Sequence, residues 1–285
     1  MSSLPIKKIY CDTLYKRFDS KSTSDFKIDL PQTIKLPKNC VCYVDDISIP
    51  RMFYTVEAGV NDMLYFRISD PTFILPEFLR SDHAITIDPS DYTGTQFVAH
   101  VKSKMIAVTP NNFQINAVYD NNSRRMSISV SSQDIHFFTD EELKANYLPN
   151  IAWQGTDYDH EHTRSANELL TNYDRTMTGN SLIPASFYLN LTPVRNIYMR
   201  SPNLSSFNTI GADGSSNIIK KIPVNVASGE MITSFITSST DFLDVSNATL
   251  RTIEIQLVDV HGRTINMHGA NWSFSLLFDV MNPDQ

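Results

Sequence analysis

The densest group of side chains that could do chemistry lies at residues 157–162, which read Asp-Tyr-Asp-His-Glu-His. Carboxylates and imidazoles are common ligands of zinc in proteins. Their spacing here is not the His-Glu-x-x-His pattern that places two histidines on one face of a helix. Residues 131–160 also carry six acidic side chains against one basic side chain. We interpret the group as an exposed acidic loop, and the alternative is a surface metal site in a sandwich-fold hydrolase.

Two pairs of titratable residues are weaker candidates for acid–base catalysis. Asp45 and Asp46 are adjacent within an apolar run. Because successive residues of a strand face opposite sides of the sheet, we expect these carboxylates to point apart and not to cooperate as acid and base. His261 and His268 flank a predicted hairpin, and no motif places a Ser or Cys nucleophile beside either of them. Both histidines are predicted to lie in turns.

Motifs for nucleotide binding or nucleophilic catalysis do not occur in the chain. Residues 211–216 read Gly-Ala-Asp-Gly-Ser-Ser, without the lysine and the following helix of a phosphate-binding loop. We interpret this stretch as a turn. The sequence therefore predicts that the protein is not an enzyme, with no catalytic, cofactor-binding or metal-binding residues and no cofactor.

The cysteines and tryptophans are interpreted as core residues. Cys40 and Cys42 are two positions apart in a strand-like run, so they share a face, and with Cys11 they are typical of small apolar core residues of a reducing compartment. Trp272 precedes an alternating apolar strand, which favours a core position. The alternative is a carbohydrate-binding platform that includes Trp153.

The composition excludes several classes of protein. The 285 residues carry a formal net charge of −7, whereas nucleic-acid-binding domains are usually strongly basic. No apolar run approaches the roughly 18–20 residues that cross a bilayer. Residues 1–5 lack a charged-then-apolar signal pattern, so we expect synthesis in the cytosol.

The hydrophobic pattern predicts a mainly β fold. Phe26, Ile28 and Leu30 alternate with charged residues, as in a half-buried strand. Strands are predicted at 25–30, 40–49, 52–56, 63–68, 84–87, 113–119, 126–130, 187–191, 196–200, 218–226, 231–236, 250–260 and 272–280. Many short strands joined by turns suit a two-sheet sandwich or jelly roll.

A helical segment interrupts the strands. Phe97, Val101, Met105 and Val108 form one apolar face of a helix predicted at 95–108, with Thr93 or Thr95 as its N-cap. A second short helix is predicted near residue 139, where three acidic residues follow. We expect an arm at 1–21, with a local charge of +3, a jelly-roll domain formed by 22–70 and 181–285, and an inserted α+β module at 71–180.

Two blocks of sequence resemble a viral family. The first runs from Phe26-Lys-Ile-Asp-Leu-Pro31 to Val44-Asp-Asp-Ile-Ser-Ile-Pro50. The second comprises residues 217–224, 244–246, 250–255, 258–262 and 265–269. Together they are similar to the penton-like minor capsid proteins of Maverick/Polinton elements and adintoviruses. Residues 92–94 (Tyr-Thr-Gly), with the helix and hairpin after them, are similar to insertions in viral pentons.

The resemblance implies a structural virion protein, made in the host cytosol and located in the capsid. It implies a single jelly roll at the fivefold vertices of an icosahedral shell, assembled as a homopentamer and surrounded by trimers of a double-jelly-roll, hexon-like major capsid protein. The alternative is a spike or receptor-binding protein that uses the insertion to contact a host receptor. No specific nucleic-acid binding and no membrane span are expected. Residues 1–21 are expected to tie into adjacent capsomers as a detachable arm, so their deletion should leave folding intact but hinder shell assembly.

Overall fold

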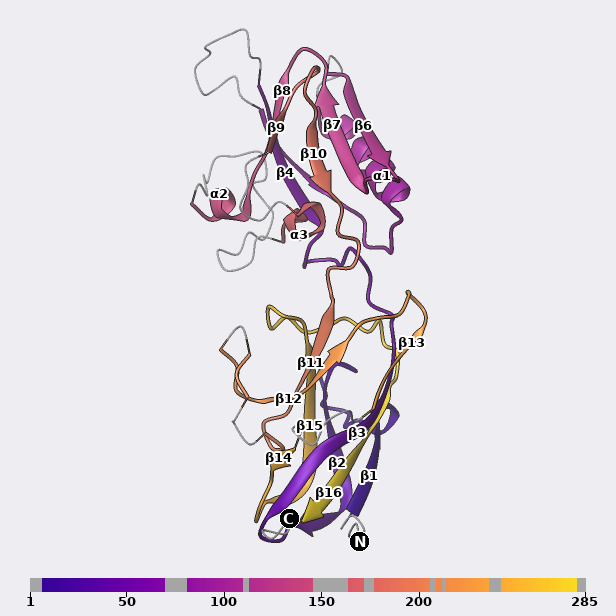
Figure 1. The fold of residues 1–285 in the computed structure, drawn as a ribbon, viewed down its shortest axis with the longest axis vertical. Coiled ribbons are helices and arrows are strands. Elements are labelled where there is room, and N and C mark those ends of the chain that lie inside the picture. Colours follow the sequence, from indigo (N-terminus) through magenta and orange to yellow (C-terminus); the bar gives the residue numbers. More distant parts are fainter. Residues whose placement is uncertain are drawn as a thin grey trace. The chain divides into compact units, whose positions relative to one another are not determined.

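The computed structural model describes residues 7–69, 81–109, 113–145, 164–171, 177–205, 209–211, 214–235 and 242–280. The chain divides into two compact units (Figure 1). Unit 1 comprises residues 1–53 and 194–285, and unit 2 comprises residues 54–193. Unit 2 is therefore an insertion between two segments of unit 1.

Unit 1 is built from two antiparallel sheets. Its elements are β1 (Lys7–Asp12), the 3-10 turn η1 (Thr13–Tyr15), β2 (Asp25–Lys35), β3 (Cys40–Pro50), β11 (Asn196–Arg200), β12 (Ile218–Pro223), β13 (Met231–Phe235), β14 (Leu243–Asp244), β15 (Thr249–Val258) and β16 (Ser273–Val280). Sheet A has the order β1-β16-β3-β13, with β14 also paired to β3, and sheet B has the order β12-β11-β15-β2.

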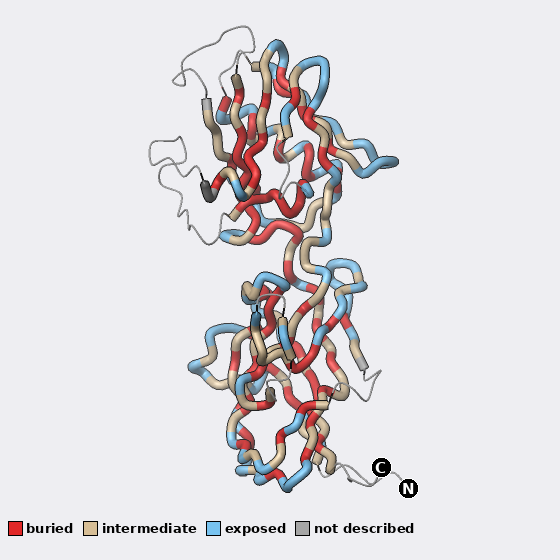
Figure 2. Tube along the Cα trace, turned by 60° about the vertical axis from the view of Figure 1, so that its left-hand side comes forward, coloured by how far each residue is buried: buried red, intermediate tan, exposed pale blue. Residues whose placement is uncertain are grey.

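Alternating side chains make one face of each sheet apolar. In β2, Phe26, Ile28 and Leu30 are buried while the residues between them are more exposed. In β16, Phe274 and Phe278 are buried against the same core. Buried residues alternate with more exposed ones along many parts of the chain (Figure 2). Burial of one such side chain contributes about 1.5–3 kcal/mol. One continuous cluster contains the buried residues of both sheets, so unit 1 is a sandwich with a single core.

The strand order of unit 1 is consistent with the predicted jelly roll. The chain crosses from β1 in sheet A to β2 in sheet B and returns to β3 in sheet A. β11 and β12 then pair within sheet B, β13 and β14 join sheet A, and β15 and β16 lie in sheets B and A. Eight-stranded double sheets connected in this way are typical of jelly rolls. The prediction of a mainly β fold is confirmed.

Two segments differ from the elements expected for them, one in unit 1 and one across the boundary after residue 53. Residues 7–12 of the expected arm form β1, which pairs along its whole length with β16. Residues 52–56 do not form the predicted strand, and only Val56 makes an isolated bridge, to Ser90. Such a run lacks a partner strand, and apolar composition alone cannot supply one.

In its described residues, unit 2 contains two smaller antiparallel sheets and three helices. Its elements are β4 (Met63–Ser69), β5 (Ser81–Thr86), α1 (Gly94–Val108), β6 (Ile115–Asp120), β7 (Arg125–Val130), β8 (Asp134–Phe137), α2 (Asp140–Ala145), α3 (Asn167–Leu170), β9 (Met177–Gly179) and β10 (Ala185–Tyr188). The sheets have the orders β5-β4-β8-β9 and β10-β7-β6. β4, which we assigned to the jelly-roll domain, thus pairs within unit 2.

Helix α1 begins and packs as its sequence predicts. Thr93 is the N-cap and forms a capping box with Gln96, so each side chain accepts a backbone N–H of the other residue. Phe97, Val101 and Met105 are fully buried on the face toward β5 and β6. The helix therefore supplies one wall of the core of unit 2.

The first loop of unit 2 is held by buried polar side chains. The Asn61 amide donates to Glu168 Oε1 at 2.8 Å and to the Thr55 carbonyl at 3.1 Å. Arg164 donates from Nε and one terminal nitrogen to the Asp62 carboxylate, at 3.1 and 2.7 Å. Buried charges are costly unless they are paired. The partners found here identify this network as structural.

The domain boundaries expected at residues 21, 70 and 180 remain a prediction. The two compact units divide the chain at other positions, after residues 53 and 193. Residues 157–162 and Trp153 lie outside the described residues. Among the helices that the structure describes, none is both long and apolar enough to span a membrane.

Candidate interaction surface

The connection between β1 and β2 exposes a group of large apolar side chains. Leu14, Tyr15 and Phe18 are 66, 76 and 99% exposed. Single exposed apolar residues are ordinary, whereas a group of them is typical of an interaction surface. We name residues 13–24 the tethered turn, because hydrogen bonds fix both its ends and its middle to the sandwich.

Trp272 fixes the two ends of the tethered turn. Its backbone N–H donates to Thr13 Oγ1 at 2.9 Å, and the Thr13 N–H donates to the Trp272 carbonyl at 3.0 Å. The indole Nε1–H donates to the Thr23 carbonyl at 2.8 Å. The buried indole packs edge-on against Phe26 and beside Phe274, with ring centroids 5.6 and 5.1 Å away. A core residue of the sandwich therefore anchors the exposed turn.

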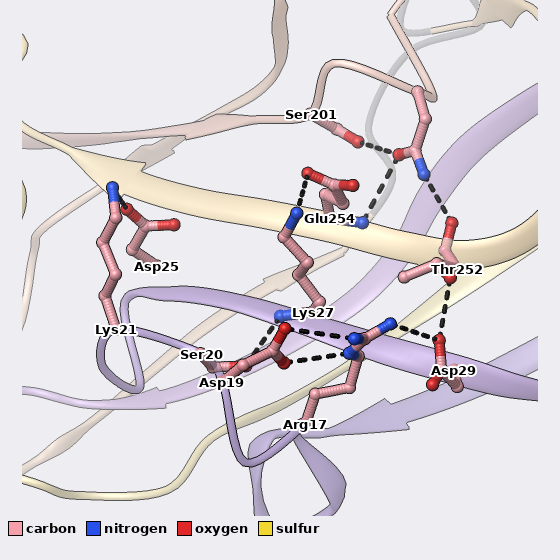
Figure 3. A network of polar contacts seen from close by, with 11 residues as sticks. Arg17, Asp19, Ser20, Lys21, Asp25, Lys27, Asp29, Ser201, Thr252 and Glu254 are labelled. Carbon is pink, nitrogen blue, oxygen red and sulfur yellow. Dashed lines mark hydrogen bonds and ion pairs between the residues drawn. The ribbon is translucent and has the colours of Figure 1, made fainter.

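Arg17 fixes the middle of the tethered turn (Figure 3). Its backbone N–H donates to the Lys27 carbonyl in β2 at 2.7 Å. Its guanidinium donates to both oxygens of Asp19, at 2.9 and 3.0 Å, and reaches Asp29 of β2 at 3.4 Å. The bond with Asp19 raises the pKa of Arg17 and lowers the pKa of the Asp19 carboxyl. The middle of the turn is therefore joined to β2 by one backbone hydrogen bond and by the charged contacts of Arg17.

The polar contacts continue across sheet B. Thr252 Oγ1 of β15 donates to Asp29 at 2.8 Å, and Lys27 Nζ lies 3.1 Å from Glu254 (Figure 3). Opposite charges directly across an antiparallel pair stabilise the pairing. The outer side chains of β2 and β15 are thus engaged with one another.

An open pocket of about 420 Å³ lies beside the tethered turn. The turn contributes Lys16, Ser22 and Thr23 to its lining, and the connection between β15 and β16 contributes residues 264–267 and Gly269. The surface next to the exposed apolar side chains is therefore hollowed.

Asp45 and Asp46 share one face of sheet A, so the expectation that they point apart was wrong. β3 pairs Asp46 with Ser275 and Val44 with Leu276, which leaves Asp45 as an extra residue. This is a β-bulge, in which two residues of one strand oppose one residue of its partner. The bulge shifts the alternation of β3 by one residue.

The burial of β3 shows the same shift. Cys40, Cys42 and Val44 are buried before the bulge, and Ile47 and Ile49 are buried after it. A strict period of two would have turned residue 46 inward and residue 47 outward. Both carboxylates therefore lie on the outer face, and the apolar residues still reach the core.

Lys8 of β1 binds this carboxylate pair. Its Nζ lies 2.5 Å from Asp45 Oδ2 and 3.8 Å from Asp46 Oδ2. Ser275 Oγ donates to Asp46 Oδ2 at 2.7 Å. The hydrogen bond to Asp45 raises the pKa of Lys8. The pair is thus bound by an ammonium and a hydroxyl, as in an ion-pair cluster.

Apolar side chains adjoin these charges on the same face. Leu277 of β16 lies opposite Tyr43 of β3, and the Tyr43 ring centroid is 5.1 Å from that of Phe242. Asp244 and Asp279 both lie opposite Val41. We name this surface the acidic face; its members are Val41, Tyr43, Asp45, Asp46, Phe242, Asp244, Leu277 and Asp279. Burial, followed by the charges of Asp45 and Asp279, raises the pKa of Tyr43.

The three cysteines are core residues with free thiols. Cys11, Cys40 and Cys42 are at most 3% exposed. Burial raises the pKa of the Cys11 thiol to about 12 and raises the pKa of the other two thiols as well. Since the thiolate is the reactive form, these groups are expected to be inert in the folded protein.

We expect an aromatic disulfide reagent at pH 8 to leave all three thiols unmodified in native protein and to label three per chain in denaturant. Thr233→Cys places a thiol at an exposed position of β13 and should be labelled at once, which makes it a matched control. Fast labelling of the unmodified native chain, with its circular dichroism unchanged, would contradict the core assignment.

The remaining sequence candidates lie in the core or in turns. Trp272 is buried, 2% exposed. His261 lies in a turn in which its N–H donates to Asp259 at 2.9 Å, and His268 has a left-handed backbone with φ of 48°. Gly214 donates to the Gly211 carbonyl at 3.0 Å, as in the expected turn. In the part of the chain that the structure describes, no three His, Cys, Asp or Glu side chains are grouped as metal ligands.

No family model and no curated protein matches the sequence. Its fold is similar to that of the mavirus penton protein. The two chains are 12% identical, and the superposition covers 96% of this chain and 100% of the mavirus chain with a TM-score of 0.48.

The sequence interpretation missed the tethered turn and the bulge. Leu14, Tyr15 and Phe18 stand among basic residues, a pattern that we assigned to a solvated arm. The sequence carried only a partial signal for the bulge: Ile47 and Ile49 alternate with Ser48, whereas residues 40–44 are apolar or aromatic at every position.

Proposed function

We propose that the chain is a structural subunit of a virion, the vertex (penton) capsomer of an icosahedral capsid, without enzymatic activity. Five copies would form a ring. The surrounding shell would consist of trimers of a double-jelly-roll major capsid protein. The chain would then be located in the capsid.

The strand order of unit 1 is the observation that carries this proposal. The two sheets, β1-β16-β3-β13 and β12-β11-β15-β2, are those expected of a single jelly roll, and unit 2 leaves the sandwich between β3 and β11. An insertion at one connection lengthens a surface loop and leaves the core of the sandwich intact.

The sequence blocks that resemble penton-like proteins support the same reading. They fall on β2, β3, β12, β14, β15 and the connection that follows β15. All of these belong to unit 1. These blocks therefore lie in the part of the chain that would build the shell. The resemblance of residues 92–94, with the helix and the hairpin after them, to insertions in viral pentons lies in unit 2.

Light scattering combined with negative-stain imaging tests the proposal. The expected particle has five times the 32.3 kDa mass of one chain and a five-membered outline. Trimers would instead favour a spike or receptor-binding protein. Should the chain be monomeric alone, co-expression with the major capsid protein should produce closed shells with this chain at the vertices, and shells that exclude it would overturn the vertex role.

A further inference from the structure

The tethered turn is an apolar protrusion whose shape is already fixed. Phe18 is 99% exposed, although the residues on both sides of it are fastened to the sandwich through Arg17 and Ser20. Backbone hydrogen bonds to Trp272 and Lys27 hold the turn at Thr13 and at Arg17, on either side of Leu14 and Tyr15. Fixed, protruding aromatic side chains are typical of docking anchors, because little conformational entropy is lost when they bind.

The charge of the turn is opposite to that of the whole chain. Residues 13–24 carry Lys16, Arg17 and Lys21 against Asp19, a net charge of +2, whereas the chain carries −7. A partner that fits this surface therefore combines an apolar contact area with negative charge. Electrostatic complementarity of this kind orients partners as they meet.

The acidic face of the same chain has both properties. The half-buried side chains of Tyr43, Phe242 and Leu277 form its apolar part. It carries the carboxylates of Asp45, Asp46, Asp244 and Asp279, and Lys8 of β1 pairs with the first two, so these five side chains have a net charge of −3.

We infer that the tethered turn of one copy docks on the acidic face of a second copy, with Leu14, Tyr15 and Phe18 against Tyr43, Phe242 and Leu277. The inference rests on the proposed function, because it assigns the contact through which the ring would close. A contact between two different patches of the same chain is heterologous, and heterologous contacts build rings when the rotation closes. Lys16 and Lys21 would then face the carboxylates of the neighbour.

A triple variant with Leu14→Ser, Tyr15→Ser and Phe18→Ser tests the contact. Since all three side chains are exposed, the melting curve should stay unchanged. The affinity between copies should fall on the order of a hundredfold, as when aromatic anchors are removed from an interface. The control variant carries Leu182→Ser, Ile183→Ser and Ile210→Ser, at positions 88, 71 and 87% exposed, and should assemble like the unmodified chain.

A crosslink between two singly substituted chains identifies the docked pair. Phe18→Cys in one chain and Tyr43→Cys in another, co-expressed and oxidised, should give a disulfide-linked dimer that neither chain gives alone. The native cysteines are buried and should not compete. Leu182→Cys paired with Tyr43→Cys serves as the control and should give no such dimer.

The outcomes separate this inference from the proposed function. A five-membered ring that survives the triple substitution and forms no crosslink overturns the docking contact and leaves the vertex role intact. An oligomer of another size that is lost in the triple variant supports the contact and removes the vertex role. If the chain is monomeric alone, the crosslink is tested in shells co-assembled with the major capsid protein, and shells that contain this chain but give no crosslinked dimer overturn the inference.

Discussion

Trp272→Ala is expected to lower the free energy of unfolding of unit 1 by about 3–5 kcal/mol, the usual cost of truncating a large buried aromatic residue. The indole packs against Phe26 and Phe274 and donates a hydrogen bond to the Thr23 carbonyl. Its loss leaves a cavity and an acceptor without its partner. Since whole domains are stable by only about 5–15 kcal/mol, this change alone should populate unfolded molecules measurably.

The three cysteines give a readout confined to unit 1. All of them belong to this unit and are buried, so their labelling in increasing urea follows its unfolding without a contribution from unit 2. Trp272→Ala should move the labelling midpoint to much lower urea. Trp272→Phe keeps an aromatic ring but loses the indole N–H, and should cost only about 1–2 kcal/mol.

Trypsin provides a second readout at the turn. Lys16, Arg17 and Lys21 lie within the tethered turn, which Trp272 holds at Thr13 and Thr23. Trp272→Ala should therefore speed cleavage at these residues before the sandwich as a whole unfolds. An unchanged labelling midpoint together with unchanged cleavage would contradict the anchoring role of Trp272.

Most strands of unit 1 were predictable because their burial alternates. β11 (Asn196–Arg200) was predicted with its observed bounds, and Phe26, Ile28 and Leu30 define β2 by period alone. In unit 2 the same reasoning found α1, since Phe97, Val101 and Met105 repeat at helical spacing. Local pattern suffices when one face of an element is buried and the other is not.

Strand partners were not predictable from local pattern. β1 is short, begins with two lysines and lies at the edge of sheet A, so its sequence resembles a solvated terminus. Its partner β16 lies at the other end of the chain. Likewise, the apolar sequence of β4 does not predict that this strand pairs with β5 in unit 2. Pairing between strands far apart in the sequence depends on the whole fold, and the hydrophobic period does not predict it.

The candidate interaction surface was even harder to predict from the sequence. Its apolar anchors, Leu14, Tyr15 and Phe18, are exposed, so no buried period marks them. The acidic face depends on the bulge at Asp45, because without it Asp46 would have pointed inward. Surfaces of this kind follow from the register of the strands, which the structure alone supplies.

Deletion of residues 1–21 is expected to destabilise unit 1, in contrast to the behaviour of a detachable arm. The deletion removes the six paired residues of β1, the buried side chain of Cys11 and the backbone contacts of Thr13 with Trp272. A stability loss of about 3 kcal/mol or more follows from the lost apolar burial and hydrogen bonds. The loss should appear as a lower urea midpoint for labelling of Cys40 and Cys42.

The same deletion exposes a new sheet edge. β16 would lose its outer partner along Ser273–Phe278, and an unpaired edge strand is a template for association with other chains. Concentration-dependent light scattering should therefore rise in the truncated protein even where it remains folded.

A shorter deletion shows whether the loss of stability comes from residues 1–6 or from β1 and the tethered turn. Removal of residues 1–6 leaves β1 and the tethered turn in place, so the urea midpoint should not change. If the deletion of residues 1–21 also leaves the midpoint unchanged, β1 does not contribute to the sandwich and the segment is an arm after all. Because this deletion removes Leu14, Tyr15 and Phe18 together with β1, its effect on assembly is interpretable only beside the triple serine variant. That variant keeps β1 and the sandwich intact, so an assembly defect that it shares with the deletion results from loss of the docking surface.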